Sequence, residues 1–432
     1  MSDTQRPNYR GALTVVTTIF FMWGFITCLN DILIPHLKAV FSLNYTQTML
    51  IQFTFFGAYF IMSLPMGKVL ARIGYKNAIS LGLLIAAVGA VMFYPAARAP
   101  SYPLFLTALF VLASGVTMLQ VAANPYVSLL GAEGSASSRL NLAQAFNSLG
   151  TTLAPYFGGM LILGAAVLGA SELADMSGAD RMAYRVQQAQ SVQLPYLLLA
   201  AVLAILAVVI YLWKLPNFKD QARDDSPTEN VTAAEALRHP HVLFGVIGIF
   251  AYVGAEVSIG SFLINYISLP DIGNMSESSA ASYVAYYWGG AMIGRFIGSA
   301  LMQKIRPSLM LGVFAIVAAL LTAATMLTSG HVAMWSIVAI GLFNSIMFPT
   351  IFTLGIAKLG PLTSKASSLL IMAIVGGAIL PVAQGAIADT VGIHHAFVLP
   401  LICYLFIAFY GFRGSRVIDP HPSVRGAHAA SP

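Results

Sequence analysis

Two carboxylic acids stand inside long hydrophobic stretches of the sequence. Asp31 follows a charge-free run and precedes an Ile-Leu-Ile segment, and Glu256 lies in Tyr-Val-Gly-Ala-Glu-Val-Ser with no Lys or Arg within one helical turn. Charge in such segments is costly and usually serves a function. Because desolvation favours the neutral form of an unpaired carboxyl group, both residues are candidates for carrying a proton or binding a cation.

These positions also have structural interpretations. If its helix ends near Leu29, Asp31 caps an external turn, although the Ile-Leu-Ile segment then faces water. Glu256 could be a neutral acid that is hydrogen-bonded between helices. Arg295, in another hydrophobic stretch, could pair with an acid or extend toward the cytoplasmic membrane face.

Amide side chains occur at helical spacing. Gln120 and Asn124 share one helix face, and Gln144 and Asn147 share another. Asn344 precedes a proline at the same spacing as Gln120 does. Amides donate and accept hydrogen bonds without charge, so the group favours a neutral polyhydroxylated ligand. Hydrogen bonding between helices is the alternative.

Aromatic side chains could stack on the apolar face of a sugar ring. The candidates are Trp23, Tyr252, Tyr286, Tyr287, Trp288 and Phe348. We retain Tyr252, Trp288 and Phe348 as predicted substrate-binding residues beside the amides. Most of the 26 Phe residues must instead face lipid or the protein core.

The elements that position these residues are membrane helices. Hydrophobic residues make up 58% of the chain and charged residues 9%, against roughly 25% charged in soluble domains. A membrane helix needs about 20 mainly apolar residues, and the sequence predicts twelve such segments in an all-α membrane protein. Their limits are 11–36, 46–71, 78–97, 103–130, 141–168, 194–213, 241–268, 280–303, 308–328, 332–357, 366–388 and 395–413.

The distribution of basic residues predicts the orientation. Most of the 22 Lys and Arg residues fall in alternate connections and the adjoining helix ends, and cytoplasmic loops collect basic residues. We therefore expect a multi-pass protein of the bacterial inner membrane with both termini cytoplasmic. The net charge of +6 then reflects topology rather than nucleic-acid binding. Cys28 and Cys403 both fall in hydrophobic runs, so no disulfide framework is implied.

The chain divides into two related halves. A polar segment, 214–240, separates a half at 1–213 from a half at 241–418, and 419–432 forms a cytoplasmic tail. Several helix positions repeat between the halves, which indicates a parallel six-helix repeat, the plan of the major facilitator superfamily. The matches are Ile19, Phe20 and Gly24 with Ile249, Phe250 and Gly254; Gly150, Pro155 and Gly159 with Gly376, Pro381 and Gly385; and Pro125 with Pro349.

Four segments carry a closer resemblance over nearly the whole chain, at 29–33, 122–125, 139–148 and 348–352. With these segments the sequence resembles the fucose-galactose-glucose-proton symporters, and the glucose/galactose and N-acetylglucosamine transporters more than the fucose symporter.

The resemblance implies roles and shows departures. Asp31 matches a helix-one Asp associated with proton coupling, and Asn147 matches an Asn of the sugar site. Gln120 stands where the fucose symporter has Glu, and Glu256 where it has Gln. Cys28 replaces an Asn, which favours a sugar other than fucose.

Together these features predict a symporter that moves a neutral hexose or N-acetylhexosamine by alternating access. Asp31 and Glu256 are the coupling candidates for a co-transported proton, with Na⁺ as the alternative, and no resident cofactor or metal is expected. A membrane-embedded sensor or enzyme is the less favoured class, because the loops are short and no nucleophile-base constellation appears. The expected partners are a small sugar and the lipid bilayer, without nucleic acid, and we expect a monomer.

Overall fold

The computed structural model describes residues 9–41, 45–98, 101–161, 176–213, 215–216 and 232–417. Within these ranges every regular element is a helix. The helices before residue 215 are α1 (Arg10–Phe41), α2 (Tyr45–Arg98), α3 (Tyr102–Leu129), α4 (Ala136–Leu161), α6 (Gly178–Ser191) and α7 (Gln193–Leu212), with a 3₁₀ turn η1 (Glu133–Ser135).

A second series of helices follows residue 232. It consists of α9 (Ala233–Leu237), α10 (Pro240–Ser268), α11 (Glu277–Leu301), α12 (Pro307–Leu327), α13 (Gly330–Asn344), α14 (Met347–Gly355), α15 (Thr363–Met372), α16 (Gly376–Val391), α17 (Ile393–Ala396) and α18 (Val398–Phe409). The 3₁₀ turns η3 (Gly360–Leu362) and η4 (Ala373–Val375) and a π-helical turn, η5 (Tyr410–Gly414), complete it.

Two of the predicted membrane helices share the label α2. The predicted segments 46–71 and 78–97 lie on either side of Gly74, whose φ of 79° and ψ of 167° are not helical. Only glycine adopts this positive φ readily, so the helix is broken at Gly74 and the chain turns there from one membrane helix into the next. Counted in this way, the helices of the described ranges form twelve membrane segments, as the sequence predicts.

Two other predicted helices are interrupted. The predicted segment 332–357 comprises α13 and α14, which are separated at Ser345 and Ile346. Pro349 lies in the first turn of α14, where a missing N–H costs no intrahelical bond. The predicted segment 366–388 comprises α15, η4 and α16. A further helix, α6, occupies the predicted external loop, where the Ser177 hydroxyl accepts a hydrogen bond from the Asp180 backbone at 3.2 Å and caps its start.

Two of the aligned glycines lie where corresponding pairs of helices approach closely. A Cβ on Gly150 of α4 would lie 2.2 Å from the carbonyl oxygen of Phe21 in α1. A Cβ on Gly376 at the start of α16 would lie 2.2 Å from the carbonyl oxygen of Phe250 in α10. Each glycine thus permits a close contact between corresponding helices in its half of the sequence, although Phe21 lies one position after Phe20, the residue that aligns with Phe250.

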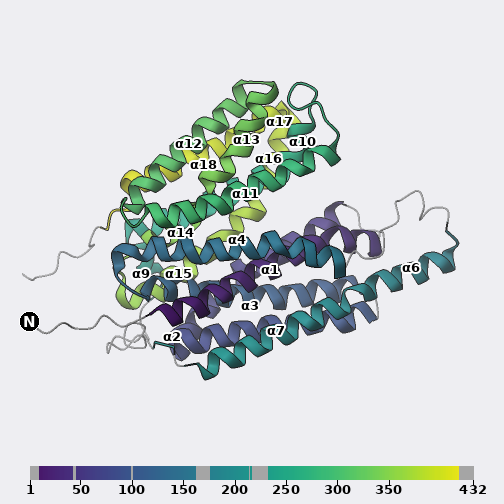
Figure 1. Cartoon of the computed structure of the whole chain (residues 1–432), viewed down its shortest axis with the longest axis horizontal. Coiled ribbons are helices and arrows are strands. Elements are labelled where there is room, and N and C mark those ends of the chain that lie inside the picture. The colour runs from purple at the N-terminus through teal and green to yellow at the C-terminus, as the bar shows by residue number, and fades with distance from the viewer. Residues whose placement is uncertain are drawn as a thin grey trace, which may run out of the picture.

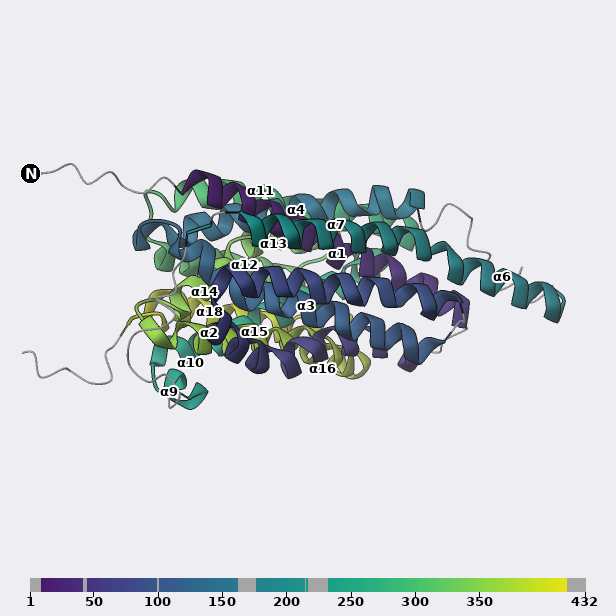
Figure 2. The same ribbon diagram turned by 90° about the horizontal axis from the view of Figure 1, so that it is seen from below.

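The two series of helices form adjoining bundles. In Figure 1, α10, α12, α13, α16, α17 and α18 lie above α1, α2, α3 and α7, and the bundles approach one another on the left and diverge toward the right. The left end carries the N-terminal side of α1 together with α9, and the right end carries α6; Figure 2 shows the same two ends. We call them the α9 end and the α6 end.

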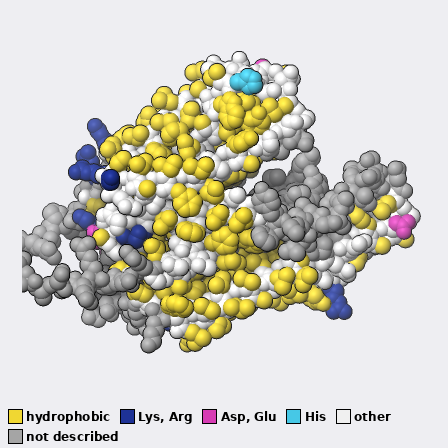
Figure 3. All heavy atoms as spheres, viewed as in Figure 1, with side chains coloured by type: hydrophobic (Ala, Val, Ile, Leu, Met, Phe, Trp, Pro, Cys, Tyr) yellow, Lys and Arg dark blue, Asp and Glu magenta, His cyan; other side chains and the backbone are white. Residues whose placement is uncertain are grey.

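The surface between the two ends suits lipid. Large hydrophobic side chains are exposed along the helices, for example Phe53, Leu212 and Leu327. Figure 3 shows hydrophobic atoms across the middle of this face, and most of its Lys and Arg side chains gather at the α9 end. Eight described helical stretches are long and apolar enough to cross a membrane. The chain is therefore a multi-pass membrane protein.

Candidate substrate and coupling site

In the N-terminal bundle, an amide and a tyrosine form a buried pair. Gln120 of α3 donates a hydrogen bond from Nε2 to the hydroxyl of Tyr59 in α2, at 2.9 Å. The same hydroxyl interacts with the indole of Trp23 in α1. Among the described residues, Oε1 of Gln120 and both polar side-chain atoms of Asn124 are buried without a hydrogen-bond partner.

The C-terminal bundle contains an equivalent pair. Asn344, the last residue of α13, donates from Nδ2 to the hydroxyl of Tyr287 in α11 at 2.8 Å. Its Oδ1 is buried and has no hydrogen-bond partner within the described part of the chain. Buried polar atoms are nearly always paired, so these amide atoms are candidates for hydrogen bonding to a ligand.

Glu256 lies at the centre of a polar cluster. The hydroxyl of Tyr252, one turn earlier in α10, donates to Glu256 Oε1 at 2.6 Å. Glu256 also interacts electrostatically with Arg295 and with Tyr287. The sequence pattern, which shows no basic residue nearby along the helix, does not reveal this environment because Arg295 comes from α11.

Arg295 connects the two bundles. Its Nε donates to the carbonyl oxygen of Ser345 at 3.1 Å, and its guanidinium also donates to the Ser148 hydroxyl of α4. A longer contact of 3.5 Å reaches the Gln144 carbonyl oxygen. Arg295 therefore points into the protein, which excludes the predicted alternative that it extends toward the membrane face.

Asn147 and Gln144 lie on α4 where it packs against α1 and α11. Asn147 donates from Nδ2 to the carbonyl oxygen of Phe20 in α1, at 3.0 Å. That nitrogen thus holds two helices together, while Gln144 is buried on the same helix. A role for either amide in sugar binding stays a prediction.

The predicted aromatic residues separate into two groups. Tyr252 and Phe348 lie beside each other, with ring centroids 6.4 Å apart, next to Glu256. Trp288 is 42% exposed and packs edge-on against Tyr287. Tyr286 is more exposed and lies on the outside of the bundle, where its ring centroid is 6.1 Å from that of Trp335. Tyr286 is therefore a surface residue rather than a stacking platform.

Asp31 lies within α1, which continues to Phe41. The alternative in which the helix ends near Leu29 and Asp31 caps a turn is therefore wrong. The structure describes the backbone of α1 at Asp31 and Cys28 but not these two side chains, so the predicted coupling role of Asp31 stays a prediction.

Neutral hydroxyl groups join the bundles near the α9 end. Ser138 of α4 donates to the carbonyl oxygen of Ser299 in α11 at 2.6 Å, and Ser299 donates back to the carbonyl oxygen of Ser138 at 2.8 Å. The hydroxyl groups of Ser137 and Thr353 lie 2.6 Å apart. Ser367 of α15 donates to the carbonyl oxygen of Val121 in α3 at 2.9 Å. We call these contacts the hydroxyl seal.

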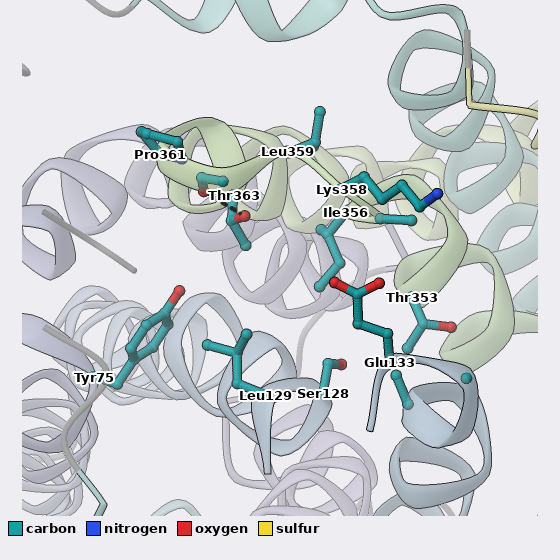
Figure 4. Close-up of a pocket in the computed structure, with 14 residues that line it drawn as sticks. Tyr75, Ser128, Leu129, Glu133, Thr353, Ile356, Lys358, Leu359, Pro361 and Thr363 are labelled. Carbon is teal, nitrogen blue, oxygen red and sulfur yellow. Dashed lines mark hydrogen bonds between the residues drawn. The ribbon is translucent and has the colours of Figure 1, made fainter. Parts of the chain in front are cut away.

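A cavity of about 640 Å³ adjoins the hydroxyl seal. Figure 4 shows Tyr75, Ser128, Leu129 and Glu133 on one side and Thr353, Ile356, Lys358 and Thr363 on the other. Thr353 belongs both to this cavity and to the seal. The cavity at the α9 end therefore borders directly on the contacts that join the two bundles.

Sequence reasoning missed Tyr59 and the hydroxyl seal. Tyr, Ser and Thr are common in membrane helices and bond to their own helix in many places, as Ser114 does with Phe110. Only the packing of separate helices distinguishes a bond between bundles from one within a helix.

Comparisons with known proteins agree with this architecture. The family model for the Major Facilitator Superfamily matches residues 14–374. A glucose/galactose transporter from Brucella abortus is 56% identical over 96% of each chain. The L-fucose-proton symporter of Escherichia coli is 36% identical over 94% of this chain and 93% of its own. A crystal structure of the transporter FucP in the outward conformation has a TM-score of 0.88 and 35% identity, and covers 95% of this chain and 100% of that one.

The fold and these relatives define a transporter rather than an enzyme. The chain belongs to the major facilitator superfamily and, within it, to the family of fucose, galactose and glucose symporters. It is a sugar transporter.

Proposed function

We propose that the protein carries D-glucose and D-galactose, or an N-acetylhexosamine, together with a proton by alternating access. The observation that carries this proposal is the set of buried amide atoms on Gln120, Asn124 and Asn344 that have no hydrogen-bond partner among the described residues. Uncharged donors and acceptors suit sugar hydroxyl groups. The glucose/galactose transporter named among its relatives supports the choice of hexose.

Asp31 and Glu256 supply the coupling in this proposal. The L-fucose-proton symporter among the relatives favours a proton. The 2.6 Å bond from Tyr252 to Glu256 also leaves one carboxyl oxygen for a proton. Sodium coupling is the second candidate, because the same carboxyl groups and nearby helix carbonyls are oxygen ligands.

Movement of the two bundles would expose the sugar alternately at each end. The hydroxyl seal closes the α9 end, and the similarity to a transporter in its outward conformation supports assigning the α6 end to the outside. In this scheme the halves at 1–213 and 241–418 rock about the buried amides, and the segment 214–240 links them in the cytoplasm.

The first test is uptake into proteoliposomes. Labelled D-glucose, D-galactose, N-acetylglucosamine and L-fucose would be offered under an imposed proton gradient, and again under a sodium gradient at clamped pH, with protein-free vesicles as the control. Proton-driven accumulation of a hexose is expected. Accumulation driven only by a sodium gradient would show that sodium, and not the proton, is the coupling ion. Absence of uptake for every sugar would overturn the proposal.

A second test uses Asn124, whose polar atoms have no partner in the described protein. Replacing an unpaired buried amide by an apolar residue of similar volume removes a desolvation cost, so Asn124→Leu should keep or raise the melting temperature. If the amide binds sugar, affinity should nevertheless fall about tenfold. Asn77→Ala is the matched control, because that exposed amide bonds within its own helix. Unchanged affinity in Asn124→Leu would remove Asn124 from the site.

A further inference from the structure

The two amide–tyrosine pairs occupy equivalent positions in the internal repeat. Gln120 lies five residues before Pro125, and Asn344 lies five residues before Pro349, the equivalent proline of the second half. Their partners, Tyr59 and Tyr287, lie in the second and eighth membrane helices, which are also equivalent. Each amide nitrogen donates to its tyrosine hydroxyl, at 2.9 Å in one bundle and 2.8 Å in the other.

Both pairs are buried. Tyr59 is 2% exposed and Gln120 is 5% exposed, and Tyr287 and Asn344 are fully buried. The Tyr59 hydroxyl also interacts with Trp23 of α1. In each pair the position of the tyrosine hydroxyl determines where the amide nitrogen lies.

Fixing the nitrogen also fixes the oxygen, because an amide group is planar. The Gln120 Oε1 and Asn344 Oδ1 atoms are therefore held in one orientation, and both lack a hydrogen-bond partner among the described residues. An unpaired buried carbonyl is unfavourable unless something donates to it. Two such acceptors at equivalent positions in the two bundles suit a ligand with hydroxyl donors on two sides.

We infer that Tyr59 and Tyr287 are positioning residues, which hold the Gln120 and Asn344 oxygens as paired acceptors for two hydroxyl groups of one sugar. This inference rests on the proposed function. It adds that the sugar must donate to both bundles at once. A sugar that lacks one of these hydroxyls leaves one carbonyl unpaired, and so the pairs contribute to substrate selection.

The test is removal of each hydroxyl with the ring retained. Tyr59→Phe and Tyr287→Phe would be compared with Tyr266→Phe, a buried tyrosine whose hydroxyl bonds instead to the Thr325 carbonyl at 2.5 Å. The readouts are KM and maximal rate for labelled D-glucose and D-galactose in proteoliposomes, and the melting temperature. We expect KM to rise about fivefold or more in the first two variants, with little change in maximal rate, and to stay at the wild-type value in the third.

Double variants make the assignment specific. If Tyr59 acts only by orienting Gln120, Tyr59→Phe should add little to the effect of Gln120→Leu, because effects on one interaction are not additive. The same holds for Tyr287→Phe with Asn344→Leu. Full additivity in both cases would show that the tyrosines act elsewhere, and would overturn the inference.

The outcomes separate the inference from the proposed function. A wild-type protein that moves no hexose overturns the proposed function, and the assignment of the tyrosines with it. A wild-type protein that transports hexose, beside Tyr59→Phe and Tyr287→Phe variants with the KM of Tyr266→Phe, overturns the tyrosine assignment alone. A lower melting temperature with unchanged KM gives the tyrosines a structural role and has the same consequence.

Discussion

Glu256 is surrounded by groups that respond to its charge. Tyr252 donates to it, and Arg295 and Tyr287 interact with it electrostatically. Arg295 in turn donates to the Ser148 hydroxyl of α4 in the other bundle. A change in the charge of Glu256 would therefore alter the balance of forces on Arg295, whose guanidinium joins α11 to α4. Under the proposed function, this arrangement would link proton binding at Glu256 to movement of the bundles.

Replacement of Glu256 tests that route. Glu256→Gln keeps the shape and can still accept the Tyr252 hydrogen bond, but it cannot gain or lose a proton. We expect concentrative uptake to be lost while sugar-for-sugar exchange persists, since exchange requires only the rocking motion. Uptake under a proton gradient and counterflow without a gradient would be measured side by side. Accumulation at the wild-type level would show that Glu256 serves only as a hydrogen-bonding group.

The residue types of the site were predictable, but their partners were not. Glu256 and the amides stand out because polar groups in apolar helices are costly. Tyr59 does not stand out, because a tyrosine in such a helix can face lipid, as Tyr286 does with 59% exposure. The hydrogen bond from Gln120 to Tyr59 joins residues far apart in sequence, and helix spacing alone does not reveal it.

At the scale of helices, the apolar pattern that lipid requires predicts where the membrane segments lie, but it does not predict where packing interrupts a helix. The twelve segments follow from their apolar length, and the close contacts of Gly150 and Gly376 agree with the repeat read from the sequence. The breaks at Ser345 and Ile346 and at η4 were not predicted. Each break lies within one long apolar stretch, and neighbouring helices can satisfy the freed backbone groups, so the apolar pattern continues where the helix does not.

The hydroxyl seal should set the preference between the two open states. Ser138 and Ser299 exchange two hydrogen bonds between the bundles, each contributing about 1 kcal/mol. A Ser138→Ala, Ser299→Ala double variant should therefore shift the population toward opening at the α9 end by about tenfold or more. Ser114→Ala is the matched control, because its hydroxyl bonds within α3 at 2.7 Å.

Accessibility of the cavity beside the seal would measure this shift. A cysteine introduced at Ser128, which lines the cavity, should react faster with a water-soluble maleimide in the double variant than in the wild-type background or in Ser114→Ala. Equal rates in all three backgrounds would show that the serine bonds do not hold the α9 end closed.

At the scale of the whole molecule, charge and hydrophobicity agree on one placement in the bilayer. Hydrophobic side chains cover the middle of the face seen in Figure 3, and most of its Lys and Arg side chains lie at the α9 end. Basic residues collect on the cytoplasmic side of membrane proteins. With the α9 end on the cytoplasmic side, as we propose, the closed seal would shut the described state toward the cytoplasm.

Cysteine labelling would test this orientation directly. In a background with Cys28 and Cys403 replaced by alanine, single cysteines would be placed at Asp180 in α6 and at Glu235 in α9, both exposed. An impermeant maleimide should label residue 180 in intact cells, because α6 projects at the end with few basic residues. It should reach residue 235 only after the membrane is permeabilised. The two variants act as controls for each other, since each must be reactive in permeabilised cells. Labelling of residue 235 from outside intact cells would show that the orientation is the reverse of the predicted one, and that the hydroxyl seal closes the external side.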